Sequence, residues 1–458
     1  MVTNRTSEVR AADLEFRNHY RYPTGSVGVH VSLGSALCGF FRFGSSIGFG
    51  HCADGVTSES KNSKLPIVKT ARSDDSGQLE LPFDPNEVAD NLRRERYYSS
   101  STSQGSGILS ASWIRNAYYT VRKFLPVHVR KYLQRARLAD WDRIPFPSWP
   151  VDVSVDLMFE EMMRLVLNAR GGSPLPFIWF WPHGHSGAMM LTHDVEEAAG
   201  RDFCPVLMDL VETAGFRSSF QIIPEERYEV TTHLLDSLRK RGHEVNVHDL
   251  NHDGHLFRER TEFLRRAARI RHYLQDFRAE GFRSAILYRN SEWINDLGCA
   301  YDMSIPNVAH LDPQRGGCCT TFPYFLGDVI ELPLTTTQDY SLFHILQKHT
   351  LDLWEQQMKA ILQRHGLISF NIHPDYILSR QNRSVFVALL ASMAAHRQRY
   401  NLWAALPGEV NKWWRMRAKM EIVADGGRLT IRGQGAEQAQ IAYAALEGDR
   451  LVYRLADQ

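Results

Sequence analysis

Two carboxylates and their spacing give the first indication of chemistry in this sequence. Asp194 and Glu196 follow an apolar run, 177–180 and then 188–191, which predicts a buried strand that delivers acids at its carboxyl end. If the strand pleat continued, both side chains would point to the same side, so one could bind a cation while the other handles a proton. The same stretch also fits a helix start, with Thr192 as N-cap and the acids in the first turn.

A second polar stretch contains two histidines four residues apart. His248 and His252 follow an apolar strand predicted at 244–247, and on a helical turn this spacing lets both imidazoles reach one cation. Asp249 and Asp253 are near enough to orient the rings. Two imidazoles and a carboxylate leave positions open for water, which is typical of a catalytic metal site. A surface histidine pair is the alternative.

Strands and helices alternate around these two stretches. The expected strand segments are 219–223, 244–247, 282–287 and 367–372, and the expected helices are 153–169, 203–214, 231–240, 257–280, 292–297, 351–365 and 384–400. Repeated strand and helix units predict a parallel sheet, most simply a (β/α) barrel with its polar residues on one set of loops. Such a barrel would bring the acids and the histidines together.

Composition divides the chain into four segments. They are a Gly- and Ser-rich N-terminal region with a linker (1–108), a basic and amphipathic helical segment (109–174), the barrel (175–415) and a small antiparallel β domain (416–458). Within the second segment, residues 110–139 carry seven Arg or Lys, no acid, and interleaved aromatic residues. A solvated helix docked by its apolar side is expected there, and contact with an anionic membrane surface is the alternative.

Charge, hydropathy and cysteine content limit which partners and which cellular location are expected. The 53 Lys and Arg against 52 Asp and Glu give a net charge of +1, so no whole-chain field favours nucleic acid as a partner. No apolar run approaches the roughly 18 residues of a membrane span, and the start lacks the apolar core of a secretory signal. Six cysteines without a C-x-x-C pair predict reduced thiols. A cytoplasmic location is therefore expected, with membrane association only through residues 110–139.

Taken in order, the motifs resemble those of the polysaccharide deacetylases of carbohydrate esterase family 4. The similar segments are Thr192-x-Asp194, the strand near Ser219-Phe220, Gly242-His243-Glu244 followed by His248-x-x-x-His252, Gly281-Phe282-Arg283, Tyr301-Asp302-Met303-Ser304 and Leu367-Ile368-Ser369-Phe370-Asn371-Ile372-His373-Pro374. The likeness covers about residues 175–405, and the ordered set is far more specific than any single motif. It implies a distorted (β/α) barrel of the polysaccharide deacetylase type.

The resemblance also implies a role for individual residues. The residues carried over are Asp194 as catalytic base, His248 and His252 as metal ligands, Arg283 as the residue that holds the base, and His373 as general acid. In such a set the charged arginine keeps the base ionised, and the protonated histidine gives a proton to the leaving amine.

The chain departs from the family pattern at three places. The family commonly has a second Asp directly after the base, whereas Val195 stands here and Glu196 is the nearest replacement. We expect Glu196 to be the metal ligand, and the reverse assignment of the two acids is the alternative. Ala285 stands where a Pro is expected after the arginine. Asp328 and Glu331 lie near the position of an acid that supports the catalytic histidine, without a secure alignment.

These features together predict a metal-dependent hydrolase that removes an N-acyl group, expected to be acetyl, from an amine on a sugar or glycan. Zinc is the expected divalent metal because two imidazoles and a carboxylate suit it. One alternative is hydrolysis of the carbon–nitrogen bond of a small non-sugar amide. Another is a catalytically silent protein that binds glycan or a membrane surface.

Overall fold

The chain forms two compact units. The computed structural model describes residues 13–61, 64–74, 78–98 and 127–456. Unit 1 combines Met1–Arg93, Ser154–Gly184 and Arg415–Gln458, and unit 2 combines Arg94–Val153 with His185–Trp414. Contacts thus group parts of the chain that are far apart in sequence, and the four consecutive segments expected from composition stay a prediction.

Unit 1 is built from helices and short strands, which pair antiparallel except for β1 with β5. Its elements are α1 (Leu14–Tyr20), β1 (Gly28–Val31), β2 (Leu37–Phe43), β3 (Ser46–Cys52), β4 (Arg72–Ser73), β5 (Gln78–Leu81), α2 (Pro85–Arg93), α5 (Ser154–Ala169), β6 (Leu175–Ile178), β16 (Glu421–Asp425), β17 (Arg428–Arg432), β18 (Ile441–Glu447) and β19 (Arg450–Leu455). The predicted antiparallel C-terminal strands are confirmed as the pair β16–β17 and the sheet β19-β18-β6.

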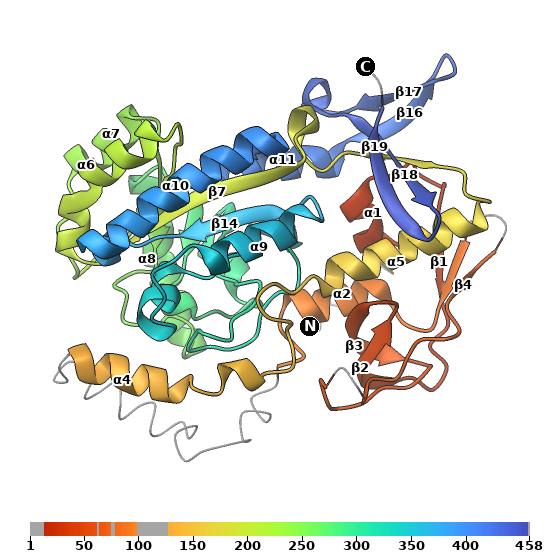
Figure 1. Cartoon of the computed structure of the whole chain (residues 1–458), viewed down its shortest axis with the longest axis horizontal. Coiled ribbons are helices and arrows are strands. Elements are labelled where there is room, and N and C mark those ends of the chain that lie inside the picture. The colour runs from red at the N-terminus through yellow and green to blue at the C-terminus, as the bar shows by residue number, and fades with distance from the viewer. Residues whose placement is uncertain (1–12, 62–63, 75–77, 99–126, 457–458) are drawn as a thin grey trace, which may run out of the picture. The chain divides into compact units, whose positions relative to one another are not determined.

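Unit 2 alternates strands and helices (Figure 1). Its elements are α4 (Val127–Arg137), β7 (Gly187–Val195), α6 (Ala198–Thr213), β8 (Ser219–Ile222), α7 (Thr232–Lys240), β9 (Glu244–His248), α8 (Arg260–Asp276), β10 (Gly281–Arg283), β11 (Tyr301–Asp302), β12 (Tyr324–Leu326), β13 (Val329–Glu331), α9 (Asp352–Leu362), β14 (Leu367–Asn371), α10 (Arg380–Tyr400) and β15 (Leu402–Ala404); α11 (Pro407–Lys419) follows.

The sheet of unit 2 is a distorted (β/α) barrel. Its strand order is β12-β13-β11-β10-β9-β8-β7-β14, with β15 also on β7, and every pair is parallel except β12 with β13. Thr335 and Thr336 lie beside the edge strand β14. The Thr336 amide and the Thr335 hydroxyl donate hydrogen bonds to carbonyls of this strand, at 3.3 and 2.7 Å. The predicted fold class is confirmed.

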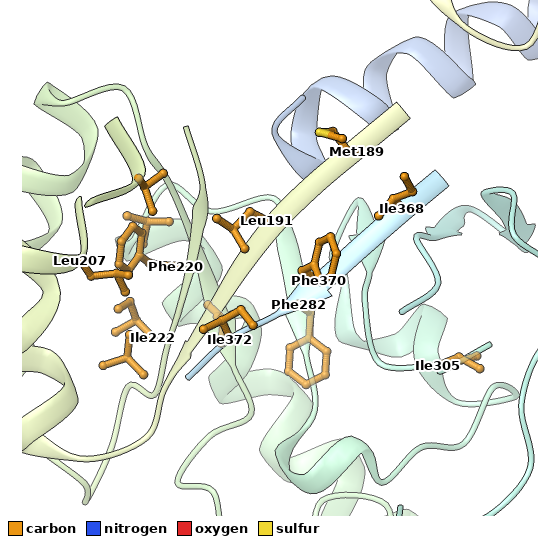
Figure 2. Close-up of a cluster of buried hydrophobic side chains, with 14 of the residues drawn as sticks. Met189, Leu191, Leu207, Phe220, Ile222, Phe282, Ile305, Ile368, Phe370 and Ile372 are labelled. Atoms are coloured by element: carbon orange, nitrogen blue, oxygen red, sulfur yellow. The ribbon is translucent and has the colours of Figure 1, made fainter. Parts of the chain in front are cut away.

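Burial on both faces explains why the strands of this barrel read as apolar runs. All nine residues of β7 are buried, as expected for parallel strands covered by helices. Figure 2 shows Leu191 of β7 between Phe220 and Ile222 of β8 on one side and Phe370 of β14 on the other. This packing fixes the strand ends that carry the polar residues.

The apolar run before the acids does not form a single strand. Leu175–Ile178 is β6, which pairs antiparallel with β18 in unit 1, and the acid-bearing strand β7 starts only at Gly187. His183 and Gly184 between them have positive φ of 52° and 69°, a left-handed turn that ends the first strand. The expectation that residues 177–180 lead directly into the acid-bearing strand is wrong.

The basic segment is described only in part. Residues 110–126 lie outside the described residues, and Val127–Arg137 forms α4. Membrane contact through residues 110–139 stays a prediction. Within the described ranges we find no helix with the length and apolar character that a bilayer crossing needs.

Two carboxyl groups face each other inside the barrel. Asp302 of β11 and Glu331 of β13 are register partners and are fully buried. Burial raises the pKa of Glu331 well above its ordinary value, and the negative charge of Asp302 raises it further. Burial also raises the pKa of Asp302. Two like charges this close in a dry interior are unfavourable, and we expect the pair to share a proton near neutral pH.

Glu331→Gln tests this shared proton. Because the folded chain holds a proton that the unfolded chain releases above about pH 4.3, the contribution of Glu331 to stability falls as pH rises from there. We expect the unfolding free energy of Glu331→Gln, measured by urea denaturation, to decline less between about pH 5 and 8 than that of the wild type. Asp328→Asn changes an exposed acid of the same hairpin and serves as control. Parallel pH curves for wild type and Glu331→Gln would contradict the shared proton.

Candidate active site

Four strands of the barrel, β7, β9, β10 and β14, deliver the predicted site residues at their carboxyl ends. The residues are Asp194 at the second-last position of β7, Glu196 just after this strand, His248 at the end of β9, His252 in the following loop, Arg283 at the end of β10 and His373 just after β14. Their backbones and side chains are largely buried, and the Glu196 side chain is the most exposed of the six at 16%. The barrel therefore brings all six together.

Glu196, His248 and His252 form a group that could hold a metal ion. One ligand atom from each lies within 4.8 Å of the others, and His252 Nε2 is 2.9 Å from Glu196 Oε1. His248 Nε2 is buried without a hydrogen-bond partner among the described residues. A buried ring nitrogen without a partner is costly, whereas a cation shared by these donors would satisfy both rings. The two nitrogens and one oxygen fit a divalent transition metal.

The two histidines do not lie on a helical turn, so this part of the sequence prediction is wrong. His248 ends β9, and the loop after it contains two left-handed residues, Asp249 at φ 53° and His252 at φ 57°. Asp and His adopt this region more readily than most side chains. His248 Nδ1 lies 3.0 Å from the Arg283 carbonyl; because a carbonyl only accepts, Nδ1 must carry the proton and the Nε2 lone pair faces the metal position.

The acids beside the histidines shape the loop instead of orienting the rings. Asp249 accepts the amides of Leu250 at 2.6 Å and Ala285 at 3.1 Å. Asp253 accepts hydrogen bonds from both Nη atoms of Arg266, at 2.7 and 2.8 Å. The expectation that Asp249 and Asp253 hold the imidazoles is therefore wrong, and the carbonyl of Arg283 orients His248.

Asp194 is fixed by two donors. Arg283 Nη1 donates to Oδ1 at 2.9 Å and also to the Thr192 hydroxyl at 2.8 Å, and Asn371 Nδ2 donates to Oδ2 at 2.8 Å. Burial by itself would raise the pKa of Asp194, but the positive charges of Arg283 and His373 and the hydrogen bond from Asn371 hold it below its ordinary value. The carboxylate is therefore charged at neutral pH, as a proton acceptor must be.

His373 is held by an acid that the sequence did not identify, Asp339. Asp339 Oδ1 lies 2.6 Å from His373 Nδ1, and Oδ2 accepts the His373 amide at 2.8 Å. Burial would lower the pKa of His373, but the charges of Asp339 and Glu196 raise it well above its ordinary value. The ring is therefore protonated, and its Nε2 lies 3.6 Å from Glu196 Oε1 and 3.8 Å from Asp194 Oδ2.

The two acids considered for this supporting role lie elsewhere. Asp328 is exposed between β12 and β13, and Glu331 faces Asp302. The signal that could have identified Asp339 is that it is the one acid in a polar stretch, 335–340, that follows a buried apolar segment and precedes an aromatic residue.

Glu196 is positioned through its backbone as well as its side chain. Asp375 accepts the Glu196 amide at 3.3 Å and the Gly200 amide at 2.9 Å, and Arg227 Nε donates to the Glu196 carbonyl at 3.1 Å. A Cβ at Gly200 would lie 2.4 Å from the Asp375 carboxylate, so the close approach requires glycine. The Tyr376 hydroxyl donates to Oε2 at 3.2 Å, which leaves Oε1 facing His252.

Several solved structures are similar to this chain over about half of its length. A protein described as a polysaccharide deacetylase from Mycobacterium smegmatis is 16% identical over 52% of this chain and 93% of that chain, with a TM-score of 0.42. An allantoinase is 11% identical over 51% and 92%, with a TM-score of 0.41. A family 4 carbohydrate esterase from Streptomyces lividans is 11% identical over 48% and 93%, with a TM-score of 0.30. No family model and no curated protein matches the sequence.

Proposed function

We propose that this protein is a divergent metal-dependent deacetylase that removes an N-acetyl group from a sugar or glycan. The observation that carries the proposal is the convergence of Glu196, His248 and His252 beside two further groups, a charged carboxylate at Asp194 and a protonated imidazole at His373. A metal-ligand set, a proton acceptor and a proton donor within a few ångströms are the parts that hydrolysis of an amide needs.

Glu196, His248 and His252 would hold the metal, for which zinc is the best fit. A divalent cation bound there supplies Lewis acidity toward the acyl oxygen and lowers the pKa of a coordinated water. In this assignment Glu196 takes the position that a second aspartate holds in the resembled family. The longer side chain compensates for its place one residue further along the chain, and Tyr376 and Asp375 hold it toward His252.

Asp194 would accept the proton of the attacking water. Oδ1 is engaged by Arg283, and Oδ2 lies 3.8 Å from both His248 Nε2 and His373 Nε2. Oδ2 is therefore the oxygen nearest to the metal-ligand set and to the proton donor. Arg283 keeps the carboxylate ionised until the water attacks, and it balances the negative charge in the buried site.

His373 would give the proton from Nε2 to the leaving nitrogen. As water gives a proton to Asp194 and its oxygen adds to the acyl carbon, the carbon–nitrogen bond breaks, the acyl group leaves as a carboxylic acid, and the nitrogen takes the proton of His373 and leaves as a neutral amine. Asp339 fixes Nδ1, so the proton that is transferred is the one on Nε2. After one turnover Asp194 holds a proton and His373 has lost one, and exchange with solvent restores both groups.

Acetate release tests the substrate class. The zinc-loaded full chain is incubated with N-acetylated oligosaccharides, O-acetylated oligosaccharides and small cyclic and linear amides, and both acetate and new amine are quantified. We expect equal amounts of acetate and amine from the N-acetylated oligosaccharides. Turnover of the small amides alone would replace the glycan assignment with the alternative amidase, and turnover of none would contradict the hydrolase.

Asp339→Asn is expected to lower kcat by about 10- to 100-fold. Asn keeps the size of the side chain but removes the charge that favours protonated His373, so less of the proton donor is present. Metal content should stay unchanged, because the hydrogen bonds of Asp339 go to His373 and not to the three proposed ligands. The comparison uses acetate-release kinetics with Asp328→Asn as control, and an unchanged kcat would show that Asp339 has no part in proton donation.

A further inference from the structure

A second group of metal-ligating side chains lies in unit 1, apart from the residues described above. Cys38 of β2 and His51 of β3 are direct cross-strand partners in the hairpin, and Glu87 lies in the first turn of α2. One ligand atom from each of the three lies within 4.8 Å of the others. Cys38 and His51 are exposed and Glu87 is half-buried, so the group is open to solvent.

An ordinary surface ion pair accounts for only part of this arrangement. His51 Nδ1 lies 2.7 Å from Glu87 Oε1, and the His51 amide donates to Oε2 at 3.4 Å. Such exposed pairs contribute at most about 1 kcal/mol, and the pair gives no role to the thiol. Of the six cysteines, all within the described residues, Cys38 alone is exposed. The thiol and the imidazole share one face because directly paired strand residues do.

We propose that Cys38, His51 and Glu87 form a second metal site, which takes zinc or another borderline divalent cation and links the hairpin β2–β3 to α2. Sulfur, imidazole nitrogen and carboxylate oxygen together are a donor set that zinc accepts and that hard cations such as magnesium do not. Three protein ligands leave the fourth tetrahedral position to water. The inference does not rest on the proposed deacetylase activity.

The protonation of Cys38 couples to this site. Without a cation, partial burial and then the negative charge of Glu87 raise the pKa of the Cys38 thiol. A bound cation reverses this balance because it binds the thiolate, and the thiol proton leaves to solvent. Metal binding at this site therefore releases a proton and protects the thiol from reagents.

Cobalt(II) separates the two metal sites, because only a thiolate ligand gives an intense near-ultraviolet charge-transfer band. The reduced, metal-free full chain is titrated with cobalt(II), and the absorbance is compared in Cys38→Ser, His51→Ala, Glu196→Gln and His30→Ala. His30 is an exposed strand histidine of the same unit and is the matched control. We expect the band in the wild type, Glu196→Gln and His30→Ala, and its loss in Cys38→Ser and His51→Ala.

Thiol labelling provides the independent readout. At a zinc concentration about 100 times the dissociation constant, labelling of Cys38 should slow by about 100-fold in the wild type and much less in His51→Ala and Glu87→Gln. A wild type without the charge-transfer band, a band that survives Cys38→Ser, or labelling that zinc leaves unchanged would each overturn the second site. Loss of acetate release in Glu196→Gln with the band intact would leave the inference standing.

Discussion

Replacement of Asp194 by Asn is expected to lower kcat for acetate release by about 10²- to 10⁴-fold. The amide has nearly the size of the carboxylate, but it cannot accept the proton of the attacking water. Metal content should persist, because the proposed ligands are Glu196, His248 and His252. The measurement is the acetate-release rate together with metal content by mass spectrometry on the same purified sample.

The control for Asp194→Asn must separate lost chemistry from lost structure. Arg283 is fully buried, and removing its counter-charge can cost about 3–5 kcal/mol of stability. Urea denaturation therefore accompanies the kinetics. Asp253→Asn removes a neighbouring acid that pairs with Arg266 and should leave kcat near the wild-type value. A folded Asp194→Asn chain with wild-type kcat would show that another group accepts the proton.

Glu196→Gln is expected to weaken metal binding at the candidate site by more than about 100-fold and to abolish acetate release at limiting metal. The amide keeps the length of the side chain but loses the charge that faces His252. Glu197→Gln is a matched control, because Glu197 is the next residue, is exposed and pairs with Arg227. Zinc affinity is measured by calorimetric titration of the metal-free variants.

Comparing the two acid variants decides between the assignments of the acids. If Asp194 were the ligand and Glu196 the base, Asp194→Asn would lose metal and Glu196→Gln would keep it. The geometry favours Asp194 as the base and Glu196 as the ligand, because Asp194 already accepts hydrogen bonds from Arg283 and Asn371. Glu196 Oε1 instead lies 2.9 Å from His252 Nε2, which is one of the three candidate ligand atoms.

The order of strands and helices in unit 2 could be predicted because it depends on local patterns. A parallel strand covered by helices is apolar along its whole length, as β7 and β14 are. Helix ends were less accurate. The predicted helix 257–280 is Arg260–Asp276 in the structure, because Glu259 caps it by accepting the amides of Thr261 and Glu262.

The features that could not be predicted from the sequence are those that depend on partners far apart along the chain. Asp339 reaches His373 across 34 residues, and the polar stretch that contains this acid does not indicate which histidine it contacts. The strand pairing of β6 with β18 joins residues more than 260 positions apart and depends on packing in unit 1. The i, i+4 spacing of His248 and His252 predicted a helical turn. In the structure two left-handed residues, Asp249 and His252, shape this loop instead.

The central claim is that hydrolysis depends on a metal held by Glu196, His248 and His252. The most direct test is to titrate zinc into the metal-free Cys38→Ser chain, which leaves only the candidate active-site ligands, and to follow acetate release at each step. We predict that activity is absent without metal, rises in proportion to bound zinc and saturates at about one equivalent. Full activity in the metal-free chain, or activity unchanged by bound zinc, would contradict the claim.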